Sequence, residues 1–496
     1  MNRRDFCRSA FAAGSIATLS SQQVLGSAFH ALTDVTKAIQ AVTGDGAAVS
    51  LEPALLHDLK GSLRGPLILP GNAGYDHARK VWNAMIDKHP ALIVQCEGAT
   101  DVVNAVNFAR EHDLLVAVRG GGHSISGKSV CEGGMMIDMS QLNSVRTDPA
   151  ARTAWVDGGC LEGHIDHESQ QFGLVTTAGI VSHTGAAGLT LGGGFGRVCR
   201  HFGLACDSVL SIDIVTPDGQ WRHASPDENP DLYWALRGGG GNFGVVTAME
   251  FQLYPMDTTV IAGDIIWSEK DVRQVLEFYG EQGDMMPEPL NMNLTVDGTP
   301  EGERTVNIEA VWSGSHDKAE AALAPLRKLG KPIADTIAPV RYTHFQQRGD
   351  STNRHGIYSY MKSSFINEMP AGLVDAVMEN GRPEAPYRIF FMQAGGAVKR
   401  LGPSDTAFPH RAAHSNMMVI SHWEGPVNPD ANIAAVRETW AKLEPYTSGF
   451  YVNLMDASEK KTRANYGANY DRLVKVKNQY DPTNLFRLNA NIRPTV

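Results

Sequence analysis

Residues 91–127 carry the clearest pattern of apolar and polar positions in the chain. The run ALIVQ that opens this stretch is apolar and β-branched, which is typical of a buried strand. Thr100 can cap a helix that places Val102, Val106 and Ala109 on one face. A second apolar run, VAVR, then leads into the loop GGGHSISG. The pattern predicts a strand, a helix and a second strand, with a glycine loop directly after them.

The rest of the chain does not repeat this unit. GGMMIDMSQLNSVRTD and RTAWVDGGC predict two short strands with a turn at Asp148 and Pro149. Between residues 259 and 445, helical stretches such as DVRQVLEFYGEQ and HDKAEAALAPLRKLG alternate with strand-like TVNIEAVWSG and YRIFFMQAGG, so a second domain is expected there. A final helix is expected at 468–478, ending before Pro482. The fold class is therefore expected to be α+β.

Composition excludes several classes of protein. With 496 residues, of which 43% are hydrophobic, the chain can bury a large core and is long enough for two or more domains. The formal net charge of -10 offers no basic surface for a nucleic acid, so no nucleic-acid partner is expected. Beyond the N-terminus no run of about 18 or more apolar residues occurs, so no membrane span is expected.

The first 28 residues resemble a twin-arginine export signal. Arg3 and Arg4 precede Phe6 and a weakly apolar run of alanine, glycine and serine, and cleavage after Ala28 would follow small residues. A frayed basic N-terminal helix is the alternative, because Asn2 and the seventh residue depart from the usual motif. The signal predicts a periplasmic or secreted protein that folds, with any cofactor installed, before it is exported.

The cysteines and histidines give no pattern typical of a metal site. Cleavage would remove one of the six cysteines, and the remaining odd number argues against a disulfide framework. Neither CxxC nor HExxH occurs, and we interpret His164 and His167 as one face of a helix. No metal is predicted.

Two more glycine clusters, GLTLGGGFGRVCRHFG and LRGGGGNFGVVT, accompany the loop GGGHSISG. Glycine allows backbone N–H groups to approach an anion such as a pyrophosphate, so three such loops indicate a dinucleotide. Gly239, Gly241 and Gly244 satisfy GxGxxG, but the strand-like VVTAMEFQLY follows instead of a helix, which excludes a Rossmann site. GHSISG has the wrong spacing for the nucleophile elbow of a hydrolase.

Four ordered motifs carry a resemblance to a known family: RGGGHSISG, AGLTLGGGFG, LYWALRGGGGNFGVVT and NYGANYDRLVKVKNQYDPTNLFRLNANI. From about residue 83 to its end, the chain resembles the berberine bridge enzyme-like flavoproteins of the vanillyl alcohol oxidase and p-cresol methylhydroxylase (PCMH) superfamily. The resemblance implies a two-subdomain PCMH-type FAD-binding domain and an α/β substrate domain whose antiparallel sheet covers the flavin ring. The expected parts are a signal peptide (1–28), an N-terminal extension (29–82), the FAD-binding domain (83–258), the substrate domain (259–445) and a C-terminal segment that returns to the FAD-binding domain (446–496).

In the family, the histidine of the first glycine loop is bonded covalently to the 8α-methyl carbon of FAD, and by position this is His123. A neutral imidazole is a nucleophile near neutral pH, and the bond makes the flavin a stronger oxidant. The alternative for His123 is a loop histidine that only forms a hydrogen bond within a turn. Likewise, any one of the glycines could be present only because a turn requires it. The other expected FAD-binding residues are Arg119, Gly120, Gly121, Gly122, Ser124, Gly192, Gly193, Gly194, Val246 and Asn491.

The chain departs from the family pattern at two positions. Val181 stands where many relatives have a cysteine that forms a second flavin bond, so a single bond through His123 is expected; Cys160 lies too early and is interpreted as a small buried hydrophobe. Leu454 replaces the tyrosine that often serves as catalytic base. The substitutes suggested by their chemistry are, with the first two preferred, Tyr451, Lys362, Tyr358, Tyr360 and His410.

The expected activity is removal of a hydride from a C–H bond next to oxygen or nitrogen in a small molecule, with FAD as acceptor. O2 is expected to reoxidise the flavin and yield H2O2, and a residue near Thr184 influences oxygen access in relatives. Sugars and aromatic or alkaloid-like alcohols and amines are both open as substrates. A flavin-binding protein without turnover, or a dehydrogenase with another electron acceptor, is the alternative.

Overall fold

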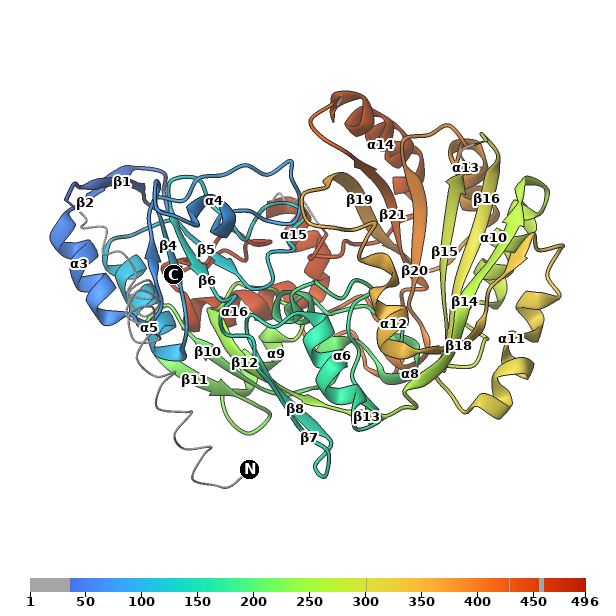
Figure 1. The fold of residues 1–496 in the computed structure, drawn as a ribbon, viewed down its shortest axis with the longest axis horizontal. Helices are drawn as coiled ribbons and strands as arrows, with labels where there is room; N and C mark the ends of the chain where they lie inside the picture. Colours follow the sequence, from blue (N-terminus) through green and yellow to red (C-terminus); the bar gives the residue numbers. More distant parts are fainter. Residues whose placement is uncertain (1–35, 300, 428, 455–458) are drawn as a thin grey trace, which may run out of the picture.

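The computed structural model describes residues 36–299, 301–427, 429–454 and 459–496. The expected signal peptide, with Arg3 and Arg4, lies outside the described residues. Two lobes lie side by side (Figure 1): residues 36–258 with the C-terminal helices form the first lobe, and residues 259–445 form the second. The mixture of helices with parallel and antiparallel sheets confirms the α+β class.

A four-stranded sheet in the first lobe contains the predicted strand, helix and strand. Its order is β3-β4-β6-β5, with β4 and β5 both parallel to β6. Its strands and the crossover helix are β3 (Leu67–Ile68), β4 (Leu92–Gln95), α5 (Ala99–Glu111), β5 (Val116–Arg119) and β6 (Met135–Asp138). Thr100 was expected to cap α5, and this is wrong: Gly98 is the N-cap residue and no side chain caps the helix. The carboxylate of Asp101 instead accepts the backbone N–H groups of Arg64 at 2.8 Å and Glu97 at 2.9 Å.

A five-stranded antiparallel sheet completes the first lobe, in the order β11-β10-β12-β8-β7. The predicted hairpin with its turn at Asp148 and Pro149 is the β7–β8 pair. The strands are β7 (Val145–Asp148), β8 (Thr153–Asp157), β10 (Val209–Val215), β11 (Trp221–Ala224) and β12 (Val245–Gln252). Two short pairs lie outside it, β1 (Ile39–Val42) with β2 (Ala48–Leu51) and β9 (Leu174–Val175) with β13 (Tyr254–Pro255). The other helices of this lobe are α3 (Pro53–Ser62), α4 (Tyr75–Ala78), α6 (Glu162–Gln170), α7 (Ala186–Leu191), α8 (Cys199–Phe202) and α9 (Pro230–Leu236).

The second lobe is built on one antiparallel sheet, as the family resemblance implied. Its order is β17-β14-β16-β15-β20-β21-β19, and β18 also pairs with β14. The strands are β14 (Thr259–Ser268), β15 (Leu290–Gly298), β16 (Arg304–Trp312), β17 (Ala334–Asp335), β18 (Ala338–Arg341), β19 (Tyr358–Ile366), β20 (Arg388–Gln393) and β21 (Ser415–Trp423).

Helices cover one face of this sheet (Figure 1). They are α10 (Val272–Gln282), α11 (Ala319–Arg327), α13 (Ala371–Asn380) and α14 (Pro429–Leu443), while α12 (Tyr342–Gln346) lies toward the first lobe. Alternate residues of the strands, such as Ile265, Ile308 and Phe391, pack with the apolar faces of the covering helices in one core. The opposite face of the sheet therefore turns toward the first lobe. Even α14, at 15 residues the longest described helix, is too short to cross a membrane, and no described helix has the length and apolarity to do so.

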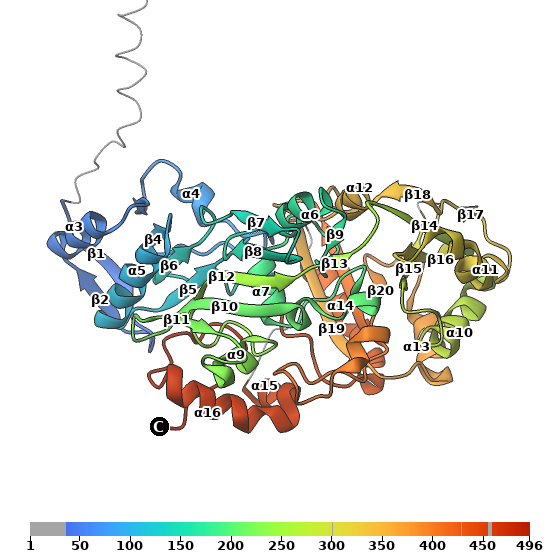
Figure 2. The same cartoon turned by 90° about the horizontal axis from the view of Figure 1, so that it is seen from below.

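The C-terminal helices α15 (Glu459–Tyr466) and α16 (Tyr470–Tyr480) return to the first lobe, where α16 runs beside α9 (Figure 2). The helix predicted at 468–478 is α16, shifted by two residues. Lys477 is fully buried, and its three amine protons are all used: they are donated to Asp481 at 2.6 Å and to the carbonyls of Asn242 at 2.7 Å and Phe486 at 2.9 Å. This cation ties the C-terminal segment to the third glycine cluster.

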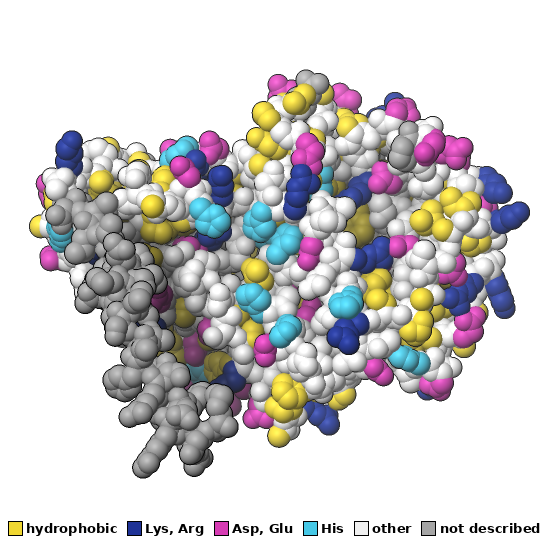
Figure 3. Space-filling view, viewed as in Figure 1, with side chains coloured by type: hydrophobic (Ala, Val, Ile, Leu, Met, Phe, Trp, Pro, Cys, Tyr) yellow, Lys and Arg dark blue, Asp and Glu magenta, His cyan; other side chains and the backbone are white. Residues whose placement is uncertain are grey.

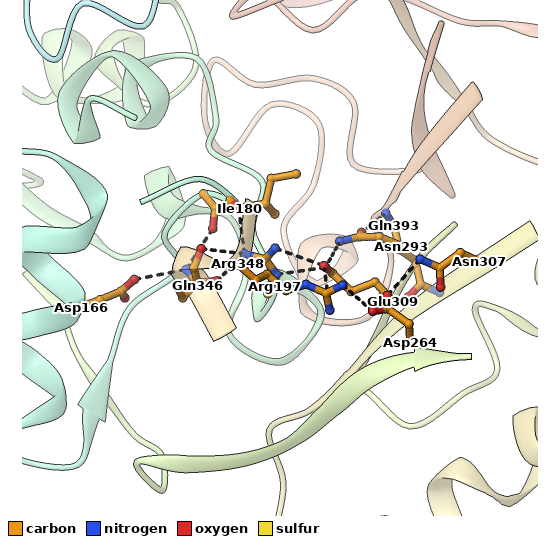
Figure 4. A network of polar contacts seen from close by, with 11 residues as sticks. Asp166, Ile180, Arg197, Asp264, Asn293, Asn307, Glu309, Gln346, Arg348 and Gln393 are labelled. Carbon is orange, nitrogen blue, oxygen red and sulfur yellow. Dashed lines mark hydrogen bonds and ion pairs between the residues drawn. The ribbon is translucent and has the colours of Figure 1, made fainter. Parts of the chain in front are cut away.

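Arg197 joins the two lobes (Figure 4). Its guanidinium, in the loop after α7, donates two hydrogen bonds to Glu309 of β16, at 3.0 and 3.1 Å, and one to Gln346 of α12 at 2.9 Å. Burial alone would raise the pKa of Glu309, but Arg197 and the neighbouring Arg348 hold it below its usual value. The pair is therefore charged and nearly dry, since only 3% of the Arg197 side chain is exposed.

We predict that Arg197→Met destabilises the protein by about 3–5 kcal/mol, because it leaves the Glu309 carboxylate buried without its partner. Arg273, paired with Asp375 at 2.7 Å but 47% exposed, is the matched control, and Arg273→Met should cost less than about 1 kcal/mol. Thermal unfolding of both variants measures the difference. Equal losses of stability in the two variants would mean that the association of the two lobes does not depend on Arg197.

Candidate functional site

Two cavities meet where the lobes face each other. The larger, of about 720 Å³, lies between the glycine segments of the first lobe and the uncovered face of the second-lobe sheet. The smaller, of about 130 Å³, lies inside the first lobe. They share the lining residues Val118, Gly120, Lys128, Gly188, Val452, Asn453 and Asn489, so they form one continuous space.

The loop after β5 borders both cavities because its glycines allow close backbone packing. A Cβ atom on Gly121 would lie 2.4 Å from the Cα of Gly185, and Gly122 has a φ of +68°. Gly120 lines both cavities, and Gly121, Gly122, His123 and Ser124 line the larger one. The structure thus brings this predicted set together.

His123 lies in a dry cluster of rings. Its imidazole stacks on Trp82 at 4.8 Å, and the rings of His183 and His355 lie 5.1 and 6.2 Å away. Burial, together with these two histidines, lowers the pKa of His123 to about 3, so the ring is neutral. Its Nε2 has no hydrogen-bond partner among the described residues. Histidines gather across the middle of the face seen in Figure 3.

The smaller cavity is bordered by glycines and the C-terminal segment. Val246, predicted as a cofactor contact, lines it, together with Gly240, Gly241 and Asn489. The side-chain amide of Asn489 donates to the carbonyl of Gly241 at 2.6 Å, which fixes the two segments against each other. A Cβ atom on Gly188, which also lines this cavity, would meet no atom within 4 Å, so the backbone there is open to a ligand.

Several predicted cofactor contacts do not reach either cavity, and we correct them. A Cβ atom on Gly192 would lie 2.1 Å from Oδ1 of Asn453, and Gly193 packs against Phe408. The N–H of Gly194 donates to the hydroxyl of Tyr451 at 3.1 Å. These glycines serve close packing behind the cavity wall.

Arg119 and Asn491 also line neither cavity. Arg119 forms an ion pair with Asp138 at 3.3 Å, beneath the loop. Sequence reasoning missed the lining residues Gly185, Gly188, Gly240, Gly241 and Asn489, although all of them lie in or beside motifs that signalled the family.

The joined cavities fit FAD. Glycines from several segments line the smaller cavity, where the backbone can approach a pyrophosphate closely. The larger cavity has the volume of a site for a ring system and a small substrate together, and the unpartnered nitrogen of His123 borders it. The residues that would hold the cofactor are Gly120, Gly121, Gly122, His123, Ser124, Gly185, Gly188, Gly240, Gly241, Val246 and Asn489.

Tyr451 is the only one of the five predicted bases that lines the cavity. Its hydroxyl oxygen accepts hydrogen bonds from the N–H of Gly194 at 3.1 Å and the amide of Asn453 at 2.9 Å. Burial raises the pKa of Tyr451 to about 12, against these two hydrogen bonds, so the phenol is protonated at neutral pH. It is placed to donate a hydrogen bond, rather than to accept a proton.

The other four candidates lie away from the cavity. On β19, Met361 lines the cavity, so its neighbours Lys362 and Tyr360 point to the other face, where the Lys362 amine lies 5.7 Å from the Tyr360 ring. Tyr358 packs against the ring of Trp423. The structure therefore does not support Lys362, Tyr360 or Tyr358 as groups that reach a substrate.

His410 is a packing residue. Its ring stacks on Phe365 at 4.5 Å, and Nε2 lies 3.0 Å from Oδ1 of Asn465. Burial lowers the pKa of His410 to about 4. It does not line the cavity.

His422 is the lining base that sequence reasoning missed. It lies on β21, where the ring of Trp82 meets it edge-on at 5.8 Å, and its Nε2 has no partner among the described residues. Burial lowers the pKa of His422 to about 4, so the imidazole is neutral and can accept a proton or hydrogen bond. No local motif marks this residue.

Both positions at which the chain departs from the family pattern, Val181 and Leu454, line the cavity. None of the five described cysteines does, and all five are buried as free thiols. Cys160, predicted to be a small buried residue, is fully buried, and burial raises its pKa to about 12. The larger cavity is thus bordered by the loop that carries the buried His123, and no thiol of the described residues lines it.

Comparison with known proteins identifies the family. Residues 90–225 match the model of an FAD binding domain, and residues 450–493 match the model named berberine and berberine like. An FAD-linked oxidoreductase of Dictyostelium discoideum is 31% identical over 438 residues, which cover 87% of this chain and 95% of that protein. A chitooligosaccharide oxidase of Gibberella zeae is 27% identical, over 94% of this chain and 99% of that one.

A solved structure supports the same assignment. The crystal structure of 6-hydroxy-D-nicotine oxidase from Arthrobacter nicotinovorans superimposes with a TM-score of 0.79 and 29% identity, over 87% of this chain and 98% of that one. The similarity extends across both lobes and the C-terminal segment. The chain belongs to the berberine bridge enzyme-like family of FAD-linked oxidoreductases.

Proposed function

We propose that this protein is an oxidase that takes a hydride from an alcohol or amine C–H bond of a small molecule and passes the electrons to O2, giving H2O2. The observation that carries the proposal is the cavity between the lobes. The loop with the neutral imidazole of His123 lines one side of it, and the uncovered face of the second-lobe sheet lines the other. FAD, when bound there, supplies the hydride acceptor. The activities named for the relatives, on hydroxynicotine and chitooligosaccharides, support this class of reaction.

The chain's own groups fit a substrate that loses a proton as it is oxidised. The neutral imidazole of His422 can accept that proton, and the protonated Tyr451 can donate a hydrogen bond to the substrate oxygen or nitrogen. Thr184 lines the same cavity, and a residue near it influences oxygen access in relatives. A binding protein without turnover, or a dehydrogenase with another acceptor, is the competing function.

We predict that a panel of sugars, benzylic alcohols and amines contains compounds that bleach the oxidised flavin of the holoprotein when mixed without oxygen. Admission of air should restore the colour and produce one H2O2 per flavin reduced, measured with a peroxidase-coupled dye. Bleaching that only an added quinone reverses would indicate a dehydrogenase. A flavin that no member of the panel reduces would indicate a protein without turnover.

We also propose that FAD is attached by one bond, through His123. The support is the buried neutral ring with a free nitrogen at the cavity and the absence of a described thiol there. A neutral imidazole keeps the lone pair that an attachment to carbon requires.

We predict that the acid-precipitated protein is yellow, whereas His123→Ala leaves its FAD in the supernatant. Mass spectrometry of proteolytic fragments should find flavin on the peptide that contains His123. His89→Ala, which changes a histidine that is 49% exposed, is the control and should keep the flavin. A yellow pellet from His123→Ala, or flavin on a cysteine, would contradict the assignment.

Finally, we propose that the protein is exported after folding. Arg3 and Arg4 resemble a twin-arginine signal, and residues as far apart in the sequence as Gly120 and Asn489 line the FAD cavity, so the chain must fold before it can hold FAD. We predict that Arg3→Lys with Arg4→Lys leaves a folded yellow precursor in the cytoplasm. The native exported protein should begin near residues 27–31 by mass spectrometry. An exported protein that still carries Arg3 and Arg4 would contradict the proposal.

A further inference from the structure

The face of the second-lobe sheet that lines the larger cavity contains three successive rungs across the strands, and His422 of β21 lies beside the first of them. Strand register defines them: Ile420 pairs with Met361 on one side and with Arg388 on the other, and Phe390 pairs with Met418 and with Thr295. The lining residues of this wall are Met361, Ile420, Arg388, Asp297 and Thr305 in the first rung, Met418, Phe390, Thr295, Asn307 and Ile266 in the second, and Met392, Glu309 and Asp264 in the third.

The wall is divided into an apolar half and a polar half. Strands β19, β20 and β21 contribute mainly methionine, phenylalanine and isoleucine side chains, with Arg388 and His422 as their polar members. Strands β14, β15 and β16 contribute mainly carboxylate, amide and hydroxyl groups. The apolar half contains the thioethers of Met361, Met392 and Met418 and the ring of Phe390, and the imidazole of His422 lies at its end. Such a surface suits a flat apolar body, because methionine sulfur and aromatic edges pack well on rings.

Two of the charged groups of the wall are paired with arginines, and two others, Arg388 and Asp297, form no ion pair with the described residues. Glu309 binds Arg197, and Asp264 binds Arg348. Arg388, at the boundary between the two halves, forms no hydrogen bond or ion pair with the described residues. Asp297 lies opposite Arg388, because the preceding residue Val296 pairs with Ile389. It is exposed, and one of its carboxylate oxygens accepts a hydrogen bond from the N–H of Gly298 at 2.9 Å.

An arginine without a partner is costly in such a position. Arg388 is partly buried; burial lowers its pKa, and the charge of Asp297 offsets part of this effect. The guanidinium presents a planar fork that matches a carboxylate with two parallel hydrogen bonds. An anionic group of a ligand would therefore complete the wall at this point.

We propose that the substrate is a small aromatic or similarly flat apolar molecule that carries a carboxylate-type anion, and that Arg388 binds this anion while the apolar body lies on Met361, Phe390 and Ile420. The inference rests on the proposed function and narrows its substrate class. It favours an aromatic acid with an oxidisable alcohol or amine over a neutral sugar. Arg388 is the specificity-determining residue in this account.

Binding of simple probes to the FAD-loaded protein tests the proposal without requiring turnover. Benzoate, benzyl alcohol and glucuronate are titrated separately, and the change in the visible spectrum of the bound flavin gives each dissociation constant. We expect benzoate to bind at least about tenfold more tightly than benzyl alcohol, which lacks the charge, and than glucuronate, which lacks the apolar ring. Arg388→Met should weaken benzoate binding by about tenfold or more and leave benzyl alcohol unchanged, while Arg388→Lys should retain part of the preference.

Two control variants separate recognition of the anion from a structural role. Arg382→Met removes an exposed arginine from the loop before β20 and should leave all three constants unchanged. Asp297→Asn should leave benzoate binding equal or tighter, because it removes a competing negative charge. An equal loss of benzoate affinity in Asp297→Asn and Arg388→Met would show that Arg388 acts by neutralising Asp297 and not by binding the anion. That result would overturn the proposal.

The remaining outcomes are also decisive. Equal affinity for benzoate and benzyl alcohol, or no spectral response to benzoate, would overturn the anion site, and glucuronate binding as tight as benzoate would overturn the apolar body. Because binding is measured on the oxidised flavin, a chain that binds benzoate as expected but oxidises nothing in the panel would contradict the proposed oxidase activity alone.

Discussion

The site exists because a buried ion pair holds a loop of one lobe against the sheet of the other. Arg197 lies within the second glycine cluster, just before α8, and its bonds to Glu309 and Gln346 fix that cluster relative to β16 and α12. Three residues later, Arg200 donates to the carbonyls of Leu290 and Ala394 at 2.9 and 3.1 Å. The buried guanidinium groups of Arg197 and Arg200 thus hold the second glycine cluster against the second-lobe sheet. The cavity lies between this sheet and the loop that carries His123. Such charges cost much desolvation energy, so they are retained where they fix geometry.

Burial of the lining side chains also determines the chemistry of the cavity. Burial lowers the pKa values of His123 and His422 to about 3 and 4 and raises that of Tyr451 to about 12. All three side chains are therefore neutral at physiological pH. The cavity offers neutral hydrogen-bonding groups beside two paired carboxylates, whereas Arg388 and Asp297 form no ion pair with a described residue. This arrangement suits hydride chemistry, in which charge must not accumulate at the substrate.

The elements that depend on local pattern could be predicted from the sequence. The unit β4–α5–β5, the β7–β8 hairpin and helix α16 follow from apolar periodicity, turn residues and proline. The site was predicted only in part, because its residues are chosen by long-range register. Whether Met361 or Lys362 faces the cavity depends on a shift of one residue in β19, which no motif reveals. Gly192–Gly194 and Gly185 belong to neighbouring stretches, yet only the tertiary packing decides which of them borders the cofactor. His422 and Arg388 meet across strands whose pairing the sequence alone does not specify.

The central claim is that the cavity between the lobes is where flavin and substrate meet. A crystal structure of the FAD-loaded protein tests it most directly. The account predicts electron density for the flavin ring in the cavity of about 720 Å³, continuous with the imidazole of His123, with the rest of the cofactor extending into the smaller cavity toward Gly188 and Asn489. Flavin density elsewhere, or a flavin that leaves no room against the wall formed by Met361, Phe390 and Ile420, would contradict it.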